Sequence, residues 1–203
     1  MNRRNFLKST SLVGLSATAI GSTFVGSTIL SACNTSPTES VGSLENDLSF
    51  VRKGAQLEAV AIKSYQAAAA SGLITNQGIL DAALRFAGHH QGHLADLNRL
   101  LREFGQAEVN LDAAQPDPRV GTLGPSSTQN DVVRLAMTLE YEAGEGYFRW
   151  LNSRPSEAKI REFFVNVYPI EVAHFIVLKG VLNGGDFAGA IDNSQFKLLS
   201  RNV

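Results

Sequence analysis

Four long segments of helical periodicity constrain the fold of this chain more than any other feature of its sequence. They run from about Asp47 to Ala70, Gln77 to Phe104, Gln129 to Leu151 and Pro155 to Leu182. In each segment apolar residues recur at intervals of three and four, which places them along one face of an α-helix. The sequence has no strand-like alternation of apolar and polar residues over any length. It therefore predicts an all-α fold.

The connections between these segments differ in length. Short links join the first segment to the second and the third to the fourth, so each pair is expected to form an antiparallel hairpin. Between the second and third lie 23 residues, Gly105 to Ser127, with three prolines. A connection of that length is uncommon in a compact domain, and here it can run along the bundle and place the third helix parallel to the second. The sequence predicts a four-helix bundle with one long crossover between helices 2 and 3.

Local signals mark the ends of the predicted helices. Asn76 is a suitable N-cap for the second helix. Ser127 or Thr128 can cap the third helix, with Asp131 in its first turn. Pro155 is acceptable in the first turn of the fourth.

Residues of the kind that bind metals interrupt the apolar face of every segment near its middle. They are Glu58 in the first segment, His90 and His93 in the second, Glu140 in the third, and Glu171 and His174 in the fourth. A carboxylate buried without a partner is costly, so four helices that each place such a group at the same height are expected to share a counter-charge. A dinuclear metal centre would supply that charge, with carboxylates bridging the ions and imidazoles at each side.

Short motifs surround these residues. The stretches LEAVAIKSY and LEYEAGEGY both have Leu-Glu followed by Tyr seven residues after the Glu, as expected for an internal repeat of a helix pair. The tyrosines are Tyr65 and Tyr147. The fourth segment has EVAH, a full Glu-x-x-His, whereas the second has HQGH.

Together these motifs resemble the ferritin-like superfamily, in its rubrerythrin and desiccation-related branches. That family places one Glu on each of two helices and a Glu-x-x-His on each of the other two. The resemblance covers Asp47 to about Leu182. It implies a di-metal centre, iron in the first place, in a redox, oxidative-stress or metal-handling protein, with ferroxidase- or peroxidase-like activity. Tyr65 and Tyr147 would lie next to the ligands.

His90 departs from the family pattern, which has a Glu at that position. The candidate set then holds three carboxylates and three imidazoles, so a bridging carboxylate and one negative charge are lost. Two ferric ions would be less well compensated, and a mononuclear site, an asymmetric pair, or a site for zinc, copper or manganese becomes more plausible. The alternative is a metal-free, degenerate ferritin-like scaffold that acts as a membrane-tethered binding or structural module. His89 is interpreted as a solvent-facing or hydrogen-bonded residue and not as a ligand.

The N-terminus has the features of an export signal. Arg3, Arg4 and Lys8 precede an uncharged run, and this pattern resembles a twin-arginine signal. The run ends in Leu-Ser-Ala before Cys33, which resembles a lipoprotein lipobox. These resemblances imply export by the twin-arginine machinery, lipidation of Cys33, and a membrane-anchored periplasmic or cell-envelope protein. A plain N-terminal membrane anchor with an inert cysteine is the other interpretation.

The predicted organisation is a signal segment at 1–32, a flexible tether at 33–46, the bundle at 47–183 and a tail at 184–203. The signal segment has three basic residues and no acid, so the remainder has 15 basic and 19 acidic side chains and a net charge of −4. That charge disfavours nucleic acid as a partner, since such binding depends on clustered Lys and Arg. A single cysteine excludes an intrachain disulfide and a Cys-rich zinc site. A homo-oligomer is compatible with the resemblance, whereas a storage cage fits a lipid-tethered protomer poorly.

Overall fold

The computed structural model of the 203-residue chain describes residues 42–185. The predicted signal segment, the lipidation of Cys33, most of the tether and nearly all of the C-terminal tail lie outside the described residues.

Four α-helices make up most of the described chain. They are α1 (Leu44–Ala70), α2 (Gln77–Glu103), α3 (Gln129–Asn152) and α4 (Ala158–Leu182). Two short 3-10 helices, η2 (Leu111–Ala113) and η3 (Pro118–Thr122), lie in the connection between α2 and α3. Residues 42–185 contain no strand, so the predicted all-α helical bundle is confirmed at that level.

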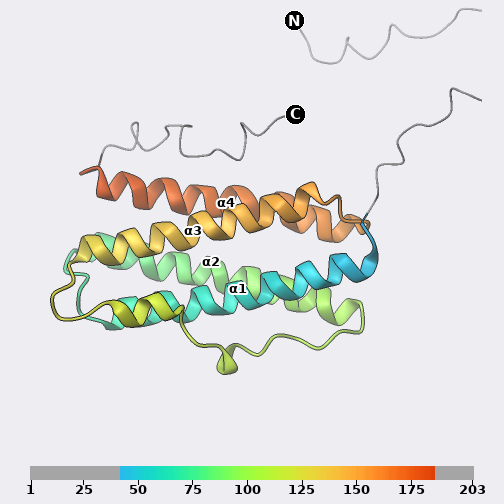
Figure 1. The fold of residues 1–203 in the computed structure, drawn as a ribbon, viewed down its shortest axis with the longest axis horizontal. Coiled ribbons are helices and arrows are strands. Elements are labelled where there is room, and N and C mark those ends of the chain that lie inside the picture. The colour runs from blue at the N-terminus through green and yellow to red at the C-terminus, as the bar shows by residue number, and fades with distance from the viewer. Residues whose placement is uncertain (1–41, 186–203) are drawn as a thin grey trace, which may run out of the picture. The chain divides into compact units, whose positions relative to one another are not determined.

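The helices form two antiparallel hairpins, α1 with α2 and α3 with α4 (Figure 1). The hairpins pack on each other through contacts of α1 with α3 and of α2 with α4. The long connection returns along the bundle from the end of α2, so α3 runs in the same direction as α2 (Figure 1). This is the geometry that the length of the connection predicts.

Polar contacts hold the crossover against the helices. Asn98 on α2 exchanges two hydrogen bonds with the backbone of Val109, at 3.0 and 2.8 Å. Further along, the guanidinium of Arg119 donates to Asp117 and also to both carboxylate oxygens of Glu142 on α3, at 2.9 and 2.7 Å. A bidentate contact of this kind fixes geometry as well as charge. The crossover is thereby tied to both hairpins.

Most predicted helix ends are confirmed, and two helix starts differ from the prediction. Asn76 caps α2, and Thr128 caps α3 in a reciprocal capping box. The fourth helix does not include Pro155 but begins at Ala158. The carboxylate of Asp47 accepts hydrogen bonds from the Ser156 hydroxyl and the Glu157 backbone N–H, at 2.6 and 3.0 Å. This buried acid from α1 therefore caps α4, a role that the sequence does not reveal. The first helix also starts earlier than expected, at Leu44.

The bundle has two apolar cores, one towards each end. The larger includes Tyr147, Leu97 and Phe164, and the smaller includes Tyr65 and Phe86. Between them lie the buried Glu and His side chains. The polar residues identified in the sequence thus separate two apolar layers.

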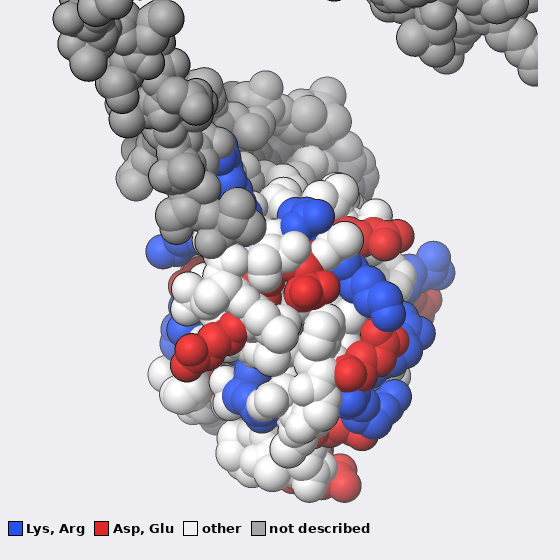
Figure 2. Space-filling view, turned by 90° about the vertical axis from the view of Figure 1, so that its right-hand side faces the viewer, with Lys and Arg blue, Asp and Glu red and all other residues white. Residues whose placement is uncertain are grey.

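The outer surface carries charges of both signs. At the end of the bundle where α2 ends and α4 begins, basic and acidic side chains are interspersed (Figure 2). The exposed pairs include Lys159 with Glu103 at 2.6 Å. Exposed pairs of this kind contribute little stability.

By length and composition alone, α4 is the one helix among the described residues that could cross a membrane. The core helix of a soluble bundle has the same composition. One face of α4 packs in the bundle and carries the buried Glu171 and His174.

Candidate metal centre

All six candidate ligands lie together at the middle of the bundle. They are Glu58 on α1, His90 and His93 on α2, Glu140 on α3, and Glu171 and His174 on α4, and are called the His/Glu cluster below. Every one of them is buried, and none is more than 7% exposed. Helical periodicity alone points these side chains inward, because each lies on the apolar stripe of its helix.

His90 is the central residue of the cluster. Its Nδ1 atom is 2.7 Å from Oε2 of Glu58, and its Nε2 atom is 3.2 Å from Oε1 of Glu140. The ring therefore contacts a carboxylate from each hairpin.

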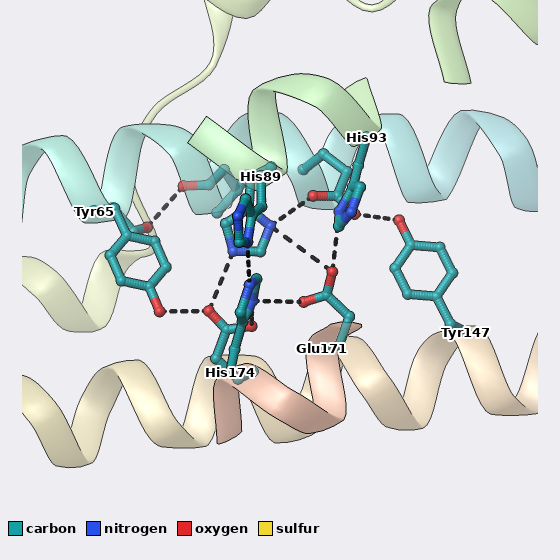
Figure 3. Close-up of polar contacts among 11 residues, drawn as sticks. Tyr65, His89, His93, Tyr147, Glu171 and His174 are labelled. Atoms are coloured by element: carbon teal, nitrogen blue, oxygen red, sulfur yellow. Dashed lines mark hydrogen bonds and ion pairs between the residues drawn. The ribbon is translucent and has the colours of Figure 1, made fainter. Parts of the chain in front are cut away.

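The other two imidazoles of the cluster lie on either side of Glu171. Nδ1 of His93 is 3.1 Å from Oε1 of Glu171, and Nδ1 of His174 is 3.7 Å from Oε2. His174 also approaches Oε2 of Glu140 at 3.1 Å. Figure 3 shows Glu171 pointing between the two imidazoles.

Two tyrosines enclose the cluster from opposite sides (Figure 3). The hydroxyl of Tyr65 on α1 donates to Glu140 on α3, and the hydroxyl of Tyr147 on α3 donates to Glu58 on α1. Each tyrosine thus holds the carboxylate of the opposite hairpin. Contacts of this kind orient a carboxylate that binds a metal.

The electrostatics of the cluster differ between its carboxylates. Burial alone would raise the pKa of Glu58, but His90 and His93 outweigh it and lower the value to about 2. Burial would also raise the pKa of Glu140, but His90 and His174 outweigh burial and lower it. For Glu171, burial together with the charges of the other two carboxylates raises the pKa, against the attraction of the nearby His174 and His93 imidazoles. Glu171 is therefore the least compensated of the three.

The imidazoles respond in the opposite sense to burial. Burial would lower the pKa of His93, but Glu171 and Glu58 raise it to about 9. The pKa values of His90 and His174 are raised for the same reason, against burial, by their carboxylate neighbours. Without a metal, the cluster favours protonated imidazoles.

The cluster divides into two groups, each able to hold a metal ion. One consists of Glu58, His90, His93 and Glu171, and the other of His90, Glu140, Glu171 and His174. Within each group one ligand atom per residue lies within 4.8 Å of all the others. His90 and Glu171 belong to both.

The hydrogen bonding of the cluster tests whether these residues fit a metal. Both carboxylate oxygens of Glu171 and the Nδ1 atom of His93 are buried. Among the described residues they have ion-pair contacts, such as His93 Nδ1 to Glu171 Oε1 at 3.1 Å, but no contact with the geometry of a hydrogen bond. Buried polar atoms usually form hydrogen bonds, so neighbouring atoms that lack one have capacity for a further partner. Carboxylate and imidazole are common ligands of transition metals, and the residues present fit such an ion.

His89 is exposed and hydrogen-bonded, in agreement with its interpretation from the sequence, but its partner was not predicted. Its Nδ1 atom lies 2.9 Å from Nε2 of His174. Burial and the neighbouring imidazoles, that of His174 foremost, lower the pKa of His89. It belongs to neither ligand group but links His174 to the solvent-exposed surface. The sequence feature that could have indicated this contact is the position of His89, one residue before His90 and at the edge of the inward face of α2.

Comparisons with known proteins show a similar fold but no family. No protein-family model matches the sequence, and no curated protein matches it. The structure is similar to that of a conserved hypothetical protein from Mycobacterium tuberculosis, with a TM-score of 0.58 and 16% sequence identity. The match covers 68% of this chain and 92% of the other. The class defined by fold and site is an all-α helical bundle with a buried His/Glu cluster that could hold metal.

Proposed function

We propose that this protein is a ferritin-like metal-binding protein whose His/Glu cluster holds two transition-metal ions. The observation that carries the proposal is the pair of buried four-residue groups that share His90 and Glu171. Glu58 and His93 would complete one metal site, and Glu140 and His174 the other. The single long crossover supports the ferritin-like assignment, because such bundles have one connection of this kind.

The charge of the cluster bears on the metal. Its three carboxylates nearly offset the charge of two divalent ions but leave two trivalent ions poorly compensated. A buried charge without compensation is strongly disfavoured. Divalent metals are the proposed occupants, iron first by resemblance, with manganese, zinc and copper as the other candidates.

The chemistry would follow from the ligands and their surroundings. A bound transition metal supplies Lewis acidity and, when it is redox-active, can accept or donate electrons. Tyr65 and Tyr147 keep Glu140 and Glu58 oriented, and the two apolar cores exclude water from both ends. A ferroxidase- or peroxidase-like oxidoreductase is the proposed activity.

Metal titration of the full chain tests the proposal. Wild-type protein should bind close to two equivalents of at least one of the four metals. Glu171→Gln should lose binding at both sites, because Glu171 is shared. Glu162→Gln, on the exposed face of the same helix, is the matched control and should bind like wild type. Protein that binds none of the four metals would refute the metal centre.

A metal-free scaffold is the second candidate, and one observation favours it. Three imidazoles face three carboxylates, and carboxylate neighbours raise the pKa of His90, His93 and His174 against burial. The protonated cluster is therefore neutral without any ion. In that case the bundle would act as a membrane-tethered binding or structural module. Unchanged thermal stability on metal addition would support it.

The location of the protein is proposed from its sequence. The twin-arginine and lipobox resemblances support export to the periplasm or cell envelope and a lipid anchor on Cys33. Cys33→Ala should move the protein from the membrane fraction to the soluble fraction. An unchanged distribution would contradict lipidation.

A further inference from the structure

A cavity of about 240 Å³ lies in the end of the bundle where α1 ends and α3 begins. All four helices and η3 contribute to its wall. In Figure 1 this is the left-hand end. The ring of Tyr65 lines the cavity, and its hydroxyl contacts Glu140 of the His/Glu cluster. Tyr65 therefore stands between the cavity and the cluster.

Side-chain size explains why a cavity lies beside Tyr65 and not beside Tyr147. Tyr147, which occupies the equivalent place in the other half, packs against Phe163 and Phe164 in a filled core. Around Tyr65 the wall instead includes Ala83 and Ala136 and other small residues. Protein interiors are usually close-packed, so the small residues around Tyr65 leave space that the aromatic residues around Tyr147 fill.

The chemistry of the wall restricts what can bind. None of the described residues that line the cavity is charged. Its three polar side chains are already engaged: Ser64 with two backbone groups, Tyr65 with Glu140, and Asn76 with the first turn of α2. A charged ligand placed among them would lose its hydration and gain no partner. An apolar ligand would gain close contacts with the aliphatic wall.

We propose that this cavity binds a small, uncharged, apolar molecule that packs against Tyr65. An apolar cavity of about 150 Å³ is enough to bind benzene. A cavity of about 240 Å³ accommodates a larger molecule, such as a two-ring aromatic hydrocarbon. The proposal is independent of the metal centre, since every residue that carries it lies outside the two ligand groups.

Naphthalene is a suitable probe, and binding is measured on the full chain with methyl resonances of the cavity residues by NMR. Wild type should bind it saturably, with and without added metal. Ala83→Leu and Ala136→Leu fill the cavity and should each weaken binding at least about tenfold. Ala173→Leu, at an exposed position of α4 outside the cavity, should bind like wild type. Naphthalene-2-sulfonate should bind at least about tenfold more weakly than naphthalene because of its charge.

Three outcomes would overturn the proposal. The first is the absence of saturable naphthalene binding to wild type. The second is equal binding by wild type and whichever cavity-filling variant folds, which would place the probe elsewhere. The third is equal binding of naphthalene and its sulfonate, which would show that the site does not select uncharged ligands. The metal titration has its own variants, so failure of one proposal leaves the other to be judged separately.

Discussion

The hydroxyl of Tyr147 on α3, a residue of the larger apolar core, donates a hydrogen bond to Glu58 on α1. Tyr147 is fully buried, and Glu58 is 2% exposed. Removal of the hydroxyl leaves a carboxylate oxygen with a weaker set of partners. A buried acceptor that loses its donor costs roughly 1–3 kcal/mol. Tyr147→Phe should therefore lower the free energy of unfolding by that amount and weaken metal binding, as chemical denaturation and metal titration will show. Tyr141→Phe, on the same helix but only half-buried, is the control and should change neither.

The pH dependence of the metal-free protein follows from two groups. His93 has its pKa raised from 6.5 to about 9, so its contribution to stability is present below pH 6.5 and is lost as pH rises through 9. Glu58 has its pKa lowered from 4.5 to about 2, so its contribution is present above pH 4.5 and is lost as pH falls towards 2. Melting temperatures of metal-free protein should be highest between these limits. A melting temperature that increases from pH 7 to 9 would contradict this assignment.

Metal affinity should have the opposite pH dependence on the alkaline side. A metal binds deprotonated imidazole, so it must displace the proton that Glu171 and Glu58 hold on His93. The affinity should increase between pH 6.5 and 9, and proton release should accompany binding in that range. Calorimetry in buffers of different ionisation enthalpy measures those protons. Binding without proton release would show that His93 is not a ligand.

Glu58 and Glu171 should respond differently to neutralisation. Glu58 is held ionised by His90 and His93, so Glu58→Gln breaks buried ion pairs and should destabilise metal-free protein by about 3–5 kcal/mol. Burial and the other two carboxylates already disfavour the ionised form of Glu171, so Glu171→Gln should destabilise metal-free protein less than Glu58→Gln does, although it also removes the contact with His93. Thermal unfolding with chelator present compares them. A larger loss in Glu171→Gln than in Glu58→Gln would contradict the assigned charges.

His90→Glu places a fourth carboxylate beside Glu58, Glu140 and Glu171. Without metal, like charges at this distance should lower the melting temperature, because the central imidazole that paired with two of them is lost. With ferrous iron the variant should gain stability and bind more metal than wild type. A variant that is destabilised without metal and is not rescued by iron would favour the scaffold.

Asp47 offers a test that does not involve the cluster. Its carboxylate caps α4 from a neighbouring helix, and loss of a cap costs about 0.5–2 kcal/mol. Asp47→Ala should reduce the free energy of unfolding by that amount and leave metal affinity unchanged. Asp96→Ala, at an exposed position on α2, is the control. Loss of metal binding in Asp47→Ala would show that the cap positions the cluster.

The sequence was sufficient to predict the bundle and its inward-facing residues, because helical spacing determines which side chains share a face. It was not sufficient to predict partners between helices. The contact of His89 with His174 depends on how far α2 is rotated against α4, and Asp47 acts through a turn distant in sequence. The cavity beside Tyr65 arises from several alanines on different helices, each of which is ordinary in its own helix.

The exchange of tyrosines between the hairpins has a consequence for symmetry. Tyr65 of α1 donates a hydrogen bond to Glu140 of α3, and Tyr147 of α3 donates one to Glu58 of α1. Two subunits related by a two-fold axis make reciprocal contacts of the same kind. Neither hairpin contains a complete tyrosine–carboxylate pair. The central cluster is therefore an interface within one chain, and a substitution in one hairpin alters the chemistry of the other.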